Sequence, residues 1–235
     1  MMHLRSALLL AALIGLPSQA ADPAKKNVYP PQPWAAWVEP DFPFFSSILD
    51  ARREGVGVNN LTPRGIVLKL SHDCWACFDT DLLRVSAVWR GKGVTDKALA
   101  PGSYLDAGRK TPGGQFPAPQ PDGKLWLGNG IFPGWQSGGK VSMTDPREPA
   151  PSVEEVGRGP VSEEVGRFER VRLVKDGVVL EYTASGSAVR EWWQASEDGD
   201  RPVVERHISV AASKKDLLLI IGAKMNGPAQ EIETG

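Results

Sequence analysis

Residues 168–222 read FERVRLVKDGVVLEYTASGSAVREWWQASEDGDRPVVERHISVAASKKDLLLIIG and carry the strongest structural signal in the chain. Apolar and polar residues alternate in the hydrophobic runs, and this period of two is typical of strands with one buried face. Turn signals separate the runs, for example at Asp176-Gly177, Ser185-Gly186-Ser187 and Gly199-Asp200. The pattern predicts an antiparallel meander of five strands, over residues 168–174, 178–184, 188–194, 203–210 and 217–222.

Such a meander predicts an all-β, mainly antiparallel fold, with a β-sandwich or supersandwich-like form, or a barrel, rather than a doubly wound sheet. Upstream, Gly65–Leu70 is apolar and rich in β-branched residues, which favours another strand. Leu82–Arg90 alternates and predicts a strand with one buried face. The content of 20 Pro and 25 Gly fits long loops. We therefore expect one β-sandwich domain over residues 64–235.

Residues 21–63 have a different composition, in which prolines and aromatic residues are interspersed. Prolines remove backbone donors, so this segment is not expected to fold by itself. We expect an extended arm whose aromatic side chains pack onto the domain, with an exposed recognition strip as the alternative. Within it, Ser46–Glu54 is predicted to form a short helix.

Residues 1–20 have the pattern of a signal peptide. His3 and Arg5 give a weakly positive start, Ala7–Leu16 is apolar, and Ser18-Gln19-Ala20 offers a cleavage pattern. The apolar run is short against the ~20 residues that span a bilayer, so we expect cleavage rather than an anchor, and no membrane span afterwards. The chain is predicted to be exported, as a periplasmic or secreted protein. Its net charge of −1 argues against a nucleic-acid partner, which needs a basic face.

The two cysteines of the chain, Cys74 and Cys77, form a C-x-x-C pair between two predicted strands. A c-type haem site would need histidine in place of Phe78, and a thioredoxin-like pair would need a βαβ setting. In an exported chain a disulfide between them is favoured, with buried reduced thiols as the alternative. A zinc site from His72, Cys74, Cys77 and Asp79 is a further alternative, although no second pair of ligands is evident.

Four carboxylates are candidates for acid–base chemistry, since paired Asp or Glu residues hydrolyse glycosides. Asp79 and Asp81 lie in the cysteine block, and Glu191 and Glu205 lie on adjacent strands of the predicted meander. Turn, capping and cross-strand pairing roles explain the same residues. The candidates for stacking on a sugar ring are Trp126, Trp135 and Trp192.

Four runs around the cysteine block stand out: LTPRGI (61–66), HDCWACFDTDLLR (72–84), WRGKG (89–93) and KTPGGQFP (110–117). They resemble an uncharacterised domain at the amino end of large exported bacterial proteins, which carry a propeller-like dehydrogenase region and a c-type cytochrome domain further on. The resemblance extends from about Trp34 to the end of the chain. It provides no catalytic residues that can be transferred to this chain and leaves its activity open. We expect no cofactor in this chain, with any haem confined to downstream domains. The meander also resembles the supersandwich of carbohydrate-active enzymes such as mutarotases, at the level of fold alone.

These observations favour an exported, non-catalytic binding or scaffolding domain, with a carbohydrate as a candidate ligand. We expect it to be the amino-terminal part of a longer polypeptide, whose downstream cytochrome or dehydrogenase domains are its partners. One alternative is a carbohydrate-active enzyme of the β-sandwich type that uses the four carboxylates. A second alternative is a metal-binding domain built on the cluster from His72 to Asp79.

Overall fold

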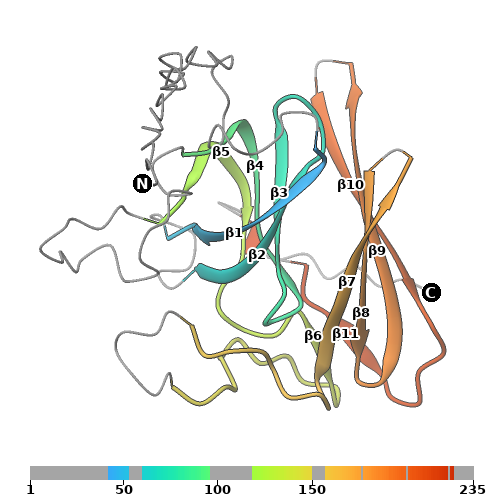
Figure 1. The fold of residues 1–235 in the computed structure, drawn as a ribbon. Helices are drawn as coiled ribbons and strands as arrows, with labels where there is room; N and C mark the ends of the chain where they lie inside the picture. Colours follow the sequence, from blue (N-terminus) through green and yellow to red (C-terminus); the bar gives the residue numbers. More distant parts are fainter. Residues whose placement is uncertain are drawn as a thin grey trace, which may run out of the picture. The chain divides into compact units, whose positions relative to one another are not determined.

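A computed structural model describes residues 42–52, 60–95, 118–149, 157–175, 177–199, 201–221 and 223–224. The predicted signal peptide and most of the predicted arm lie outside the described residues. The elements described are all β-strands, which confirms the all-β fold (Figure 1). The described part holds no helix with the length and apolar character that a membrane crossing needs.

The larger sheet has six strands in the order β1-β2-β3-β4-β5-β12, and all neighbours are antiparallel. The apolar, β-branched sequences of β2, β3 and β4 suit the middle of a sheet. Every residue of β3 is buried, as expected for a strand covered on both faces. The strands are β1 (Phe44–Asp50), β2 (Leu61–Lys69), β3 (Cys74–Asp79), β4 (Arg84–Val94), β5 (Pro121–Gly128) and β12 (Ala223–Lys224).

The strand β1 corrects the expectation of a helix over Ser46–Glu54. Phe44–Asp50 is extended and pairs along β2, with Phe44 opposite Leu68. The sheet therefore begins inside the segment that was predicted to be an arm. The helix prediction fails because local propensity is weak, and pairing with a distant strand overrides it.

The smaller sheet is the predicted meander, with its strands in the order β10-β9-β8-β7. Ala184 pairs with Ser187, so the turn between β8 and β9 has two residues, Ser185 and Gly186. Their φ angles of 45° and 81° are both positive, as a tight type I′ hairpin turn requires. The strands are β7 (Gly166–Val174), β8 (Gly177–Ala184), β9 (Ser187–Asp198) and β10 (Arg201–Val210).

The fifth predicted strand does not continue the meander. Leu217–Leu219 (β11) pairs instead with Trp135–Ser137 (β6) in a separate two-stranded sheet. Leu217 and Leu219 pack against the main core from there. The run from Leu217 to Ile221 is apolar at every position, so its sequence does not specify which strand it pairs with.

One hydrophobic cluster joins the two main sheets. The ring of Phe78 in β3 lies 5.3 Å from that of Tyr182 in β8 and 5.9 Å from that of Phe168 in β7, between centroids. Figure 1 shows the meander, in orange, facing the strands drawn in blue and green. Buried side chains of both sheets form this core, which is the arrangement of a β-sandwich.

The opposite face of the larger sheet carries a second cluster. In it the indole rings of Trp75 and Trp89 stack at 6.4 Å between centroids. Their Nε1 groups donate to the carbonyl oxygens of Gly91 (3.0 Å) and Gly93 (2.6 Å). Because both faces are covered, residues 84–89 are all buried, and the expectation of one buried face for Leu82–Arg90 is wrong.

A bulge in β4 also breaks the predicted alternation. Cys77 pairs with Ala87 and Phe78 with Val85, which leaves Ser86 as the extra residue. Val85 therefore lies in the core between the sheets, whereas Ala87, two residues on, lies in the second cluster. The bulge changes the face to which side chains around this hairpin point, and a buried polar network lies at the same hairpin.

Candidate functional site

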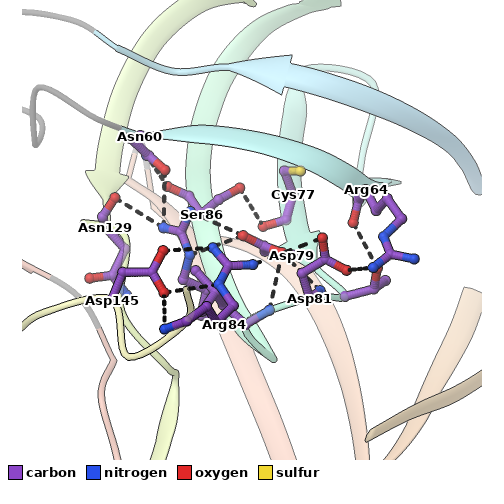
Figure 2. A network of polar contacts seen from close by, with 12 residues as sticks. Asn60, Arg64, Cys77, Asp79, Asp81, Arg84, Ser86, Asn129 and Asp145 are labelled. Atoms are coloured by element: carbon purple, nitrogen blue, oxygen red, sulfur yellow. Dashed lines mark hydrogen bonds and ion pairs between the residues drawn. The ribbon is translucent and has the colours of Figure 1, made fainter. Parts of the chain in front are cut away.

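The β3–β4 hairpin holds a buried polar network (Figure 2). Oδ1 of Asp79, at the end of β3, accepts hydrogen bonds from the backbone N–H groups of Asp81 (2.9 Å) and Leu82 (3.2 Å). Arg84, at the start of β4, donates from Nε to Oδ2 of Asp79 over 3.2 Å, and its Nη2 lies 3.1 Å from the same oxygen. The side chains of Arg84 and Asp79 are 0% and 1% exposed, so the fold encloses the whole ion pair.

Arg84 also connects the hairpin to two neighbouring strands. Its Nη1 donates to Oδ1 of Asn60 (3.0 Å) and to the carbonyl oxygen of Asn129 (3.1 Å). Asn60 in turn donates to the carbonyl oxygen of Ser86 over 2.7 Å. A buried guanidinium is costly unless its donors and its charge are matched. This network matches its charge with Asp79, and its Nε and Nη1 donors with groups before β2, after β5 and in the β3–β4 hairpin, so it fixes how these strands align.

Asp81 is enclosed beside this network and contacts a different pair of arginines. Its Oδ1 lies 2.5 Å from Nη2 of Arg64, and its Oδ2 lies 4.0 Å from Nη1 of Arg147. Burial raises the pKa of the Asp81 carboxyl, and the hydrogen bond with Arg64 partly offsets that shift. A raised pKa suits a general acid. The neighbouring carboxylate, Asp79, is committed to Arg84 and to two backbone amides.

A second polar cluster surrounds Glu191 in the core between the sheets. Its side chain is 0% exposed and accepts four hydrogen bonds. Tyr182 Oη donates over 2.7 Å, Trp193 Nε1 over 2.8 Å, and Arg206 through Nε (2.7 Å) and Nη2 (3.0 Å). Burial raises the pKa of Tyr182, whose hydroxyl oxygen also accepts from Trp135 Nε1 over 2.9 Å. Glu191 is thus a saturated acceptor that anchors β8, β9 and β10 to one another.

The four candidate carboxylates do not assemble into one acid–base pair. Asp79 lies two residues after Cys77 on β3 and therefore points to the same face of the larger sheet, which carries the second cluster. Glu191 instead faces the core between the two sheets. Glu205 points away from that core, with 53% of its side chain exposed and its Oε2 3.5 Å from Nε2 of His207. Asp79 and Asp81 share one hairpin, where each is bound by arginine.

The three candidate tryptophans occupy different environments. Trp135 is 5% exposed and donates to Tyr182, so its ring is enclosed in the core. Trp126 is partly buried and packs against the same core. Trp192 lies on the outer face of the meander, where it stacks on His207 with ring centroids 5.2 Å apart and planes 6° apart. They do not form one platform, and Trp192 is the one placed on an outer face.

The expected disulfide is not formed, and Cys74 and Cys77 are both free, buried thiols. Both residues lie in the extended strand β3. Side chains three positions apart on a strand point to opposite faces, and their Cα atoms are separated by about 10 Å, beyond the ~7 Å limit for a disulfide. Burial raises the pKa of the Cys77 thiol to about 12, so it is a poor nucleophile and metal ligand at neutral pH.

The strand also separates the residues considered for a metal site. His72 lies before β3 with its side chain 82% exposed and its Nε2 3.7 Å from Oδ1 of Asp73. Cys74 and Cys77 face opposite sides, and Asp79 is bound to Arg84. Among the described residues, no three His, Cys, Asp or Glu side chains come together as a metal-binding group.

The outer face of the meander carries a cluster that the sequence reasoning did not single out. Oε2 of Glu181 lies 2.5 Å from Nε of Arg170, and its Oε1 lies 2.8 Å from Nη2 of Arg172 and 3.6 Å from Nε of Arg190. The alternation of β7 and β9 contained this signal, because it places charged residues on one face of each strand. What it could not show was that the three arginines share one glutamate, since that depends on the cross-strand register.

Residues 76–191 match a family described as "Domain of unknown function (DUF6797)". The matched segment runs from β3 into β9 and includes the Asp79–Arg84 pair, Glu181 and Glu191. The match supports the resemblance to an uncharacterised domain, and it contains no link to cytochromes or dehydrogenases. No curated protein and no solved structure shows significant similarity to the chain.

Proposed function

We propose that this chain is a non-catalytic binding or scaffolding domain with a carbohydrate-type ligand. The observation that supports the proposal is how the hydrogen bonds, ion pairs and burial of the candidate acid–base residues engage their carboxylates. Asp79 and Glu191 are saturated by donors, Asp81 is enclosed between arginines, and Glu205 lies on the outer face. The oxygens of Asp79 and Glu191 already accept hydrogen bonds from these donors, so neither carboxylate is directed at a substrate.

The geometry of glycoside hydrolysis supports the same conclusion. Retaining enzymes hold two carboxyl groups about 5–5.5 Å apart, and inverting enzymes about 6.5–9.5 Å apart, on either side of the scissile bond. Here Glu191 lies in the core and Glu205 on the outer face of the same sheet, so these two cannot flank one bond. Asp79 and Asp81 are 1% and 2% exposed, which leaves no room for a sugar between them.

A paired binding and turnover assay tests the proposal. Purified protein is incubated with a panel of neutral and acidic polysaccharides, and retention on each polymer is measured together with the release of reducing ends. We expect retention on at least one polymer and no release. Glu164→Gln is the control variant, because this exposed carboxylate lies in the turn before β7 and is not one of the four candidates. Release of reducing ends that is abolished in a folded Asp79→Asn variant would establish the enzyme alternative instead.

The proposal includes export and a place in a longer redox protein. Its support is the leader-like composition of residues 1–20 and the resemblance of the runs around the cysteine block. The intact mass of the product in its native host tests this part. We expect a mass well above that of residues 21–235, with covalently attached haem. A product with the mass of residues 21–235 alone would reject the redox partnership and leave the binding role to be tested separately.

A further inference from the structure

The outer face of the meander concentrates positive charge on a chain that is nearly neutral overall. The side chains of Arg170, Arg172 and Arg190 surround the single carboxylate of Glu181, so the cluster has three positive charges and one negative charge. The whole chain has a net charge of −1. The excess of positive charge is therefore local to this cluster, and it is complementary to an anionic ligand.

The arginines remain accessible although they contact Glu181. Their side chains are 65%, 52% and 70% exposed, for Arg170, Arg172 and Arg190 in that order. Glu181 accepts one hydrogen bond from Arg170 and two from Arg172, whereas Nε of Arg190 stays at 3.6 Å. A guanidinium has five N–H donors. The arginines thus keep donors directed to solvent after Glu181 is bound, and Glu181 holds Arg170 and Arg172 in fixed positions.

A bulge in β7 creates this arrangement. Phe168 pairs with Tyr182, and Arg170 pairs with Glu181, so Glu169 is the extra residue. Phe168 faces the core, and without the bulge Arg170 would face the core as well. The extra residue turns Arg170 to the outer face, beside Glu181. Bulges that re-aim side chains are frequent at functional sites.

An aromatic row lies next to the charged row. Its members are cross-strand neighbours on β7 to β10, namely Arg172, Val179, Trp192 and His207. This row lies two positions along the strands from the row that contains Glu181 and Arg190. Two positions along a strand correspond to about 7 Å. Trp192 is partly buried on this face, with its ring parallel to that of His207. The indole of Trp192 and the guanidinium groups of the arginine cluster are therefore close enough for two linked sugar rings to contact both.

From this juxtaposition we infer that the outer face of β7–β10 binds a uronate-bearing polysaccharide. Sugar carboxylates lie against Arg170, Arg172 and Arg190, and the apolar face of a sugar ring lies against Trp192. The arginine fork matches a carboxylate in two-point geometry, as Arg172 already demonstrates on Glu181. A nucleic acid fits less well, because it requires a basic surface along many phosphates. This inference rests on the proposed binding function and assigns its ligand class and its surface.

Affinity electrophoresis of the full chain through gels that contain polygalacturonate tests the inference. Parallel gels contain the carboxyl-reduced polymer or dextran sulfate. We expect retardation by polygalacturonate and little by the carboxyl-reduced polymer. Arg190→Gln and Trp192→Ala are each expected to weaken binding by about 3- to 10-fold, which is the range for one exposed charged or stacking contact. Arg167→Gln is the matched control, because Arg167 is 61% exposed on β7 but pairs with Glu169 outside the cluster.

The outcomes separate this inference from the broader proposal. Retardation by neutral polymers that is unchanged in both variants would overturn the inference and leave a carbohydrate-binding function in place. Equal retardation by dextran sulfate and polygalacturonate would overturn the assignment to uronates and indicate a general anion site. Retardation by no polymer at all would overturn both. The unfolding midpoint of each variant is also measured. A loss of binding supports the inference only if that midpoint equals the wild-type value.

Discussion

At the scale of single residues, the strongest constraint is the enclosed ion pair between Asp79 and Arg84. An ion pair in the interior contributes little net stability compared with an apolar pair of the same volume, because desolvation offsets the attraction. Removal of one partner is different, since it leaves the other charge buried without compensation. The network around Arg84 therefore specifies one alignment of β2, β4 and β5 more than it adds stability.

We predict that Arg84→Met lowers the free energy of unfolding by about 3–5 kcal/mol, because the Asp79 carboxylate stays buried while its cation is lost. Urea denaturation followed by tryptophan fluorescence measures this change. Arg158→Met is the control: Arg158 is 39% exposed and 3.7 Å from Asp145, so its loss should cost less than about 1 kcal/mol. Equal effects of the two substitutions would show that burial of the Asp79–Arg84 pair is not what makes it sensitive.

The buried carboxyl of Asp81 predicts that the stability of the fold depends on pH. Burial raises its pKa in the folded state above the ordinary value of 3.8, so the folded state retains the proton at a pH where the unfolded chain has released it. The stability that this group contributes is present below the unfolded pKa and is lost as the pH rises through the folded pKa. The stability of the wild type relative to Asp81→Asn should therefore fall as the pH rises from 3.8 through the folded pKa.

Denaturation midpoints of both proteins across this pH range give the difference directly. A wild-type advantage that grows with pH would mean that the contacts with Arg64 and Arg147 dominate over burial at Asp81.

The cysteines lead to a prediction about reactivity. Both thiols should be titratable in denatured protein without a reductant, because residues three apart on a strand cannot be bridged. In the native protein Cys77 should resist alkylation at neutral pH, since it is fully enclosed and its pKa is raised to about 12. Mass spectrometry after alkylation counts the modified thiols. A native mass two hydrogens lower, with no reactive thiol after denaturation, would contradict the structure of β3.

Single residues also show how far the sequence could be interpreted. A turn or capping role was one alternative for Asp79 from its residue type, and the bonds that it accepts from the backbone of Asp81 and Leu82 are of this kind. Arg84 was misplaced, because the alternation of Leu82–Arg90 assigned it to a polar face. Its burial depends on a second layer over the sheet and on a bulge at Ser86, neither of which is a local property of the sequence.

At the scale of elements, the segment before β6 joins three parts of the fold. Gly134 donates its N–H to the carbonyl oxygen of Leu82 (2.9 Å), and its own carbonyl accepts from Ile220 (2.8 Å). It thereby connects the β3–β4 turn with the segment that follows β11. A Cβ at this position would lie 2.3 Å from the carbonyl oxygen of Leu83, which is part of the backbone. The approach is possible because residue 134 has no side chain.

We predict that Gly134→Ala destabilises the fold by about 1–3 kcal/mol, as is typical of added volume in a packed site. Thermal unfolding measures the shift. The control is Gly199→Asn, because nothing lies within 4 Å of a Cβ there and its φ of 60° is in the left-handed region that Asn adopts most readily. A variant Gly134→Ala with wild-type stability would mean that the β6 segment does not need this close approach.

The elements differ in how well local sequence predicts them. The meander β7–β10 was predictable because each of its turns is set by adjacent residues, such as Ser185-Gly186 with positive φ. β1 and β11 were not, since each gains its partner from a distant part of the chain, Leu61–Lys69 for β1 and Trp135–Ser137 for β11. Their sequences satisfy more than one pairing, and the packing of the whole sandwich selects among them.

At the scale of the whole molecule, the two sheets depend on each other through side chains from all parts of the described chain. The core between them includes Ile66 and Leu68 of β2, and Val204 and Ile208 of β10 pack against it. The polar anchor Glu191 likewise needs Arg206 of β10. The four core residues and Arg206 lie outside 76–191. The segment matched to the family therefore does not contain a complete sandwich, although it includes strands of both sheets.

We therefore predict that residues 76–191 expressed alone do not fold cooperatively, whereas residues 42–224 do. The short segment would lack β1, β2 and β10, expose the edge of β3, and leave the Glu191 carboxylate without the arginine that neutralises it. Circular dichroism during heating distinguishes the two, because a cooperative transition requires a closed core. If residues 76–191 unfolded in a sharp transition, β3–β9 would form an autonomous unit, and the contributions of β2 and β10 to the core would be dispensable. The outer face would then retain its arginine cluster but lose both Trp192 and His207, so polygalacturonate binding by that fragment would show whether the arginines alone carry the affinity.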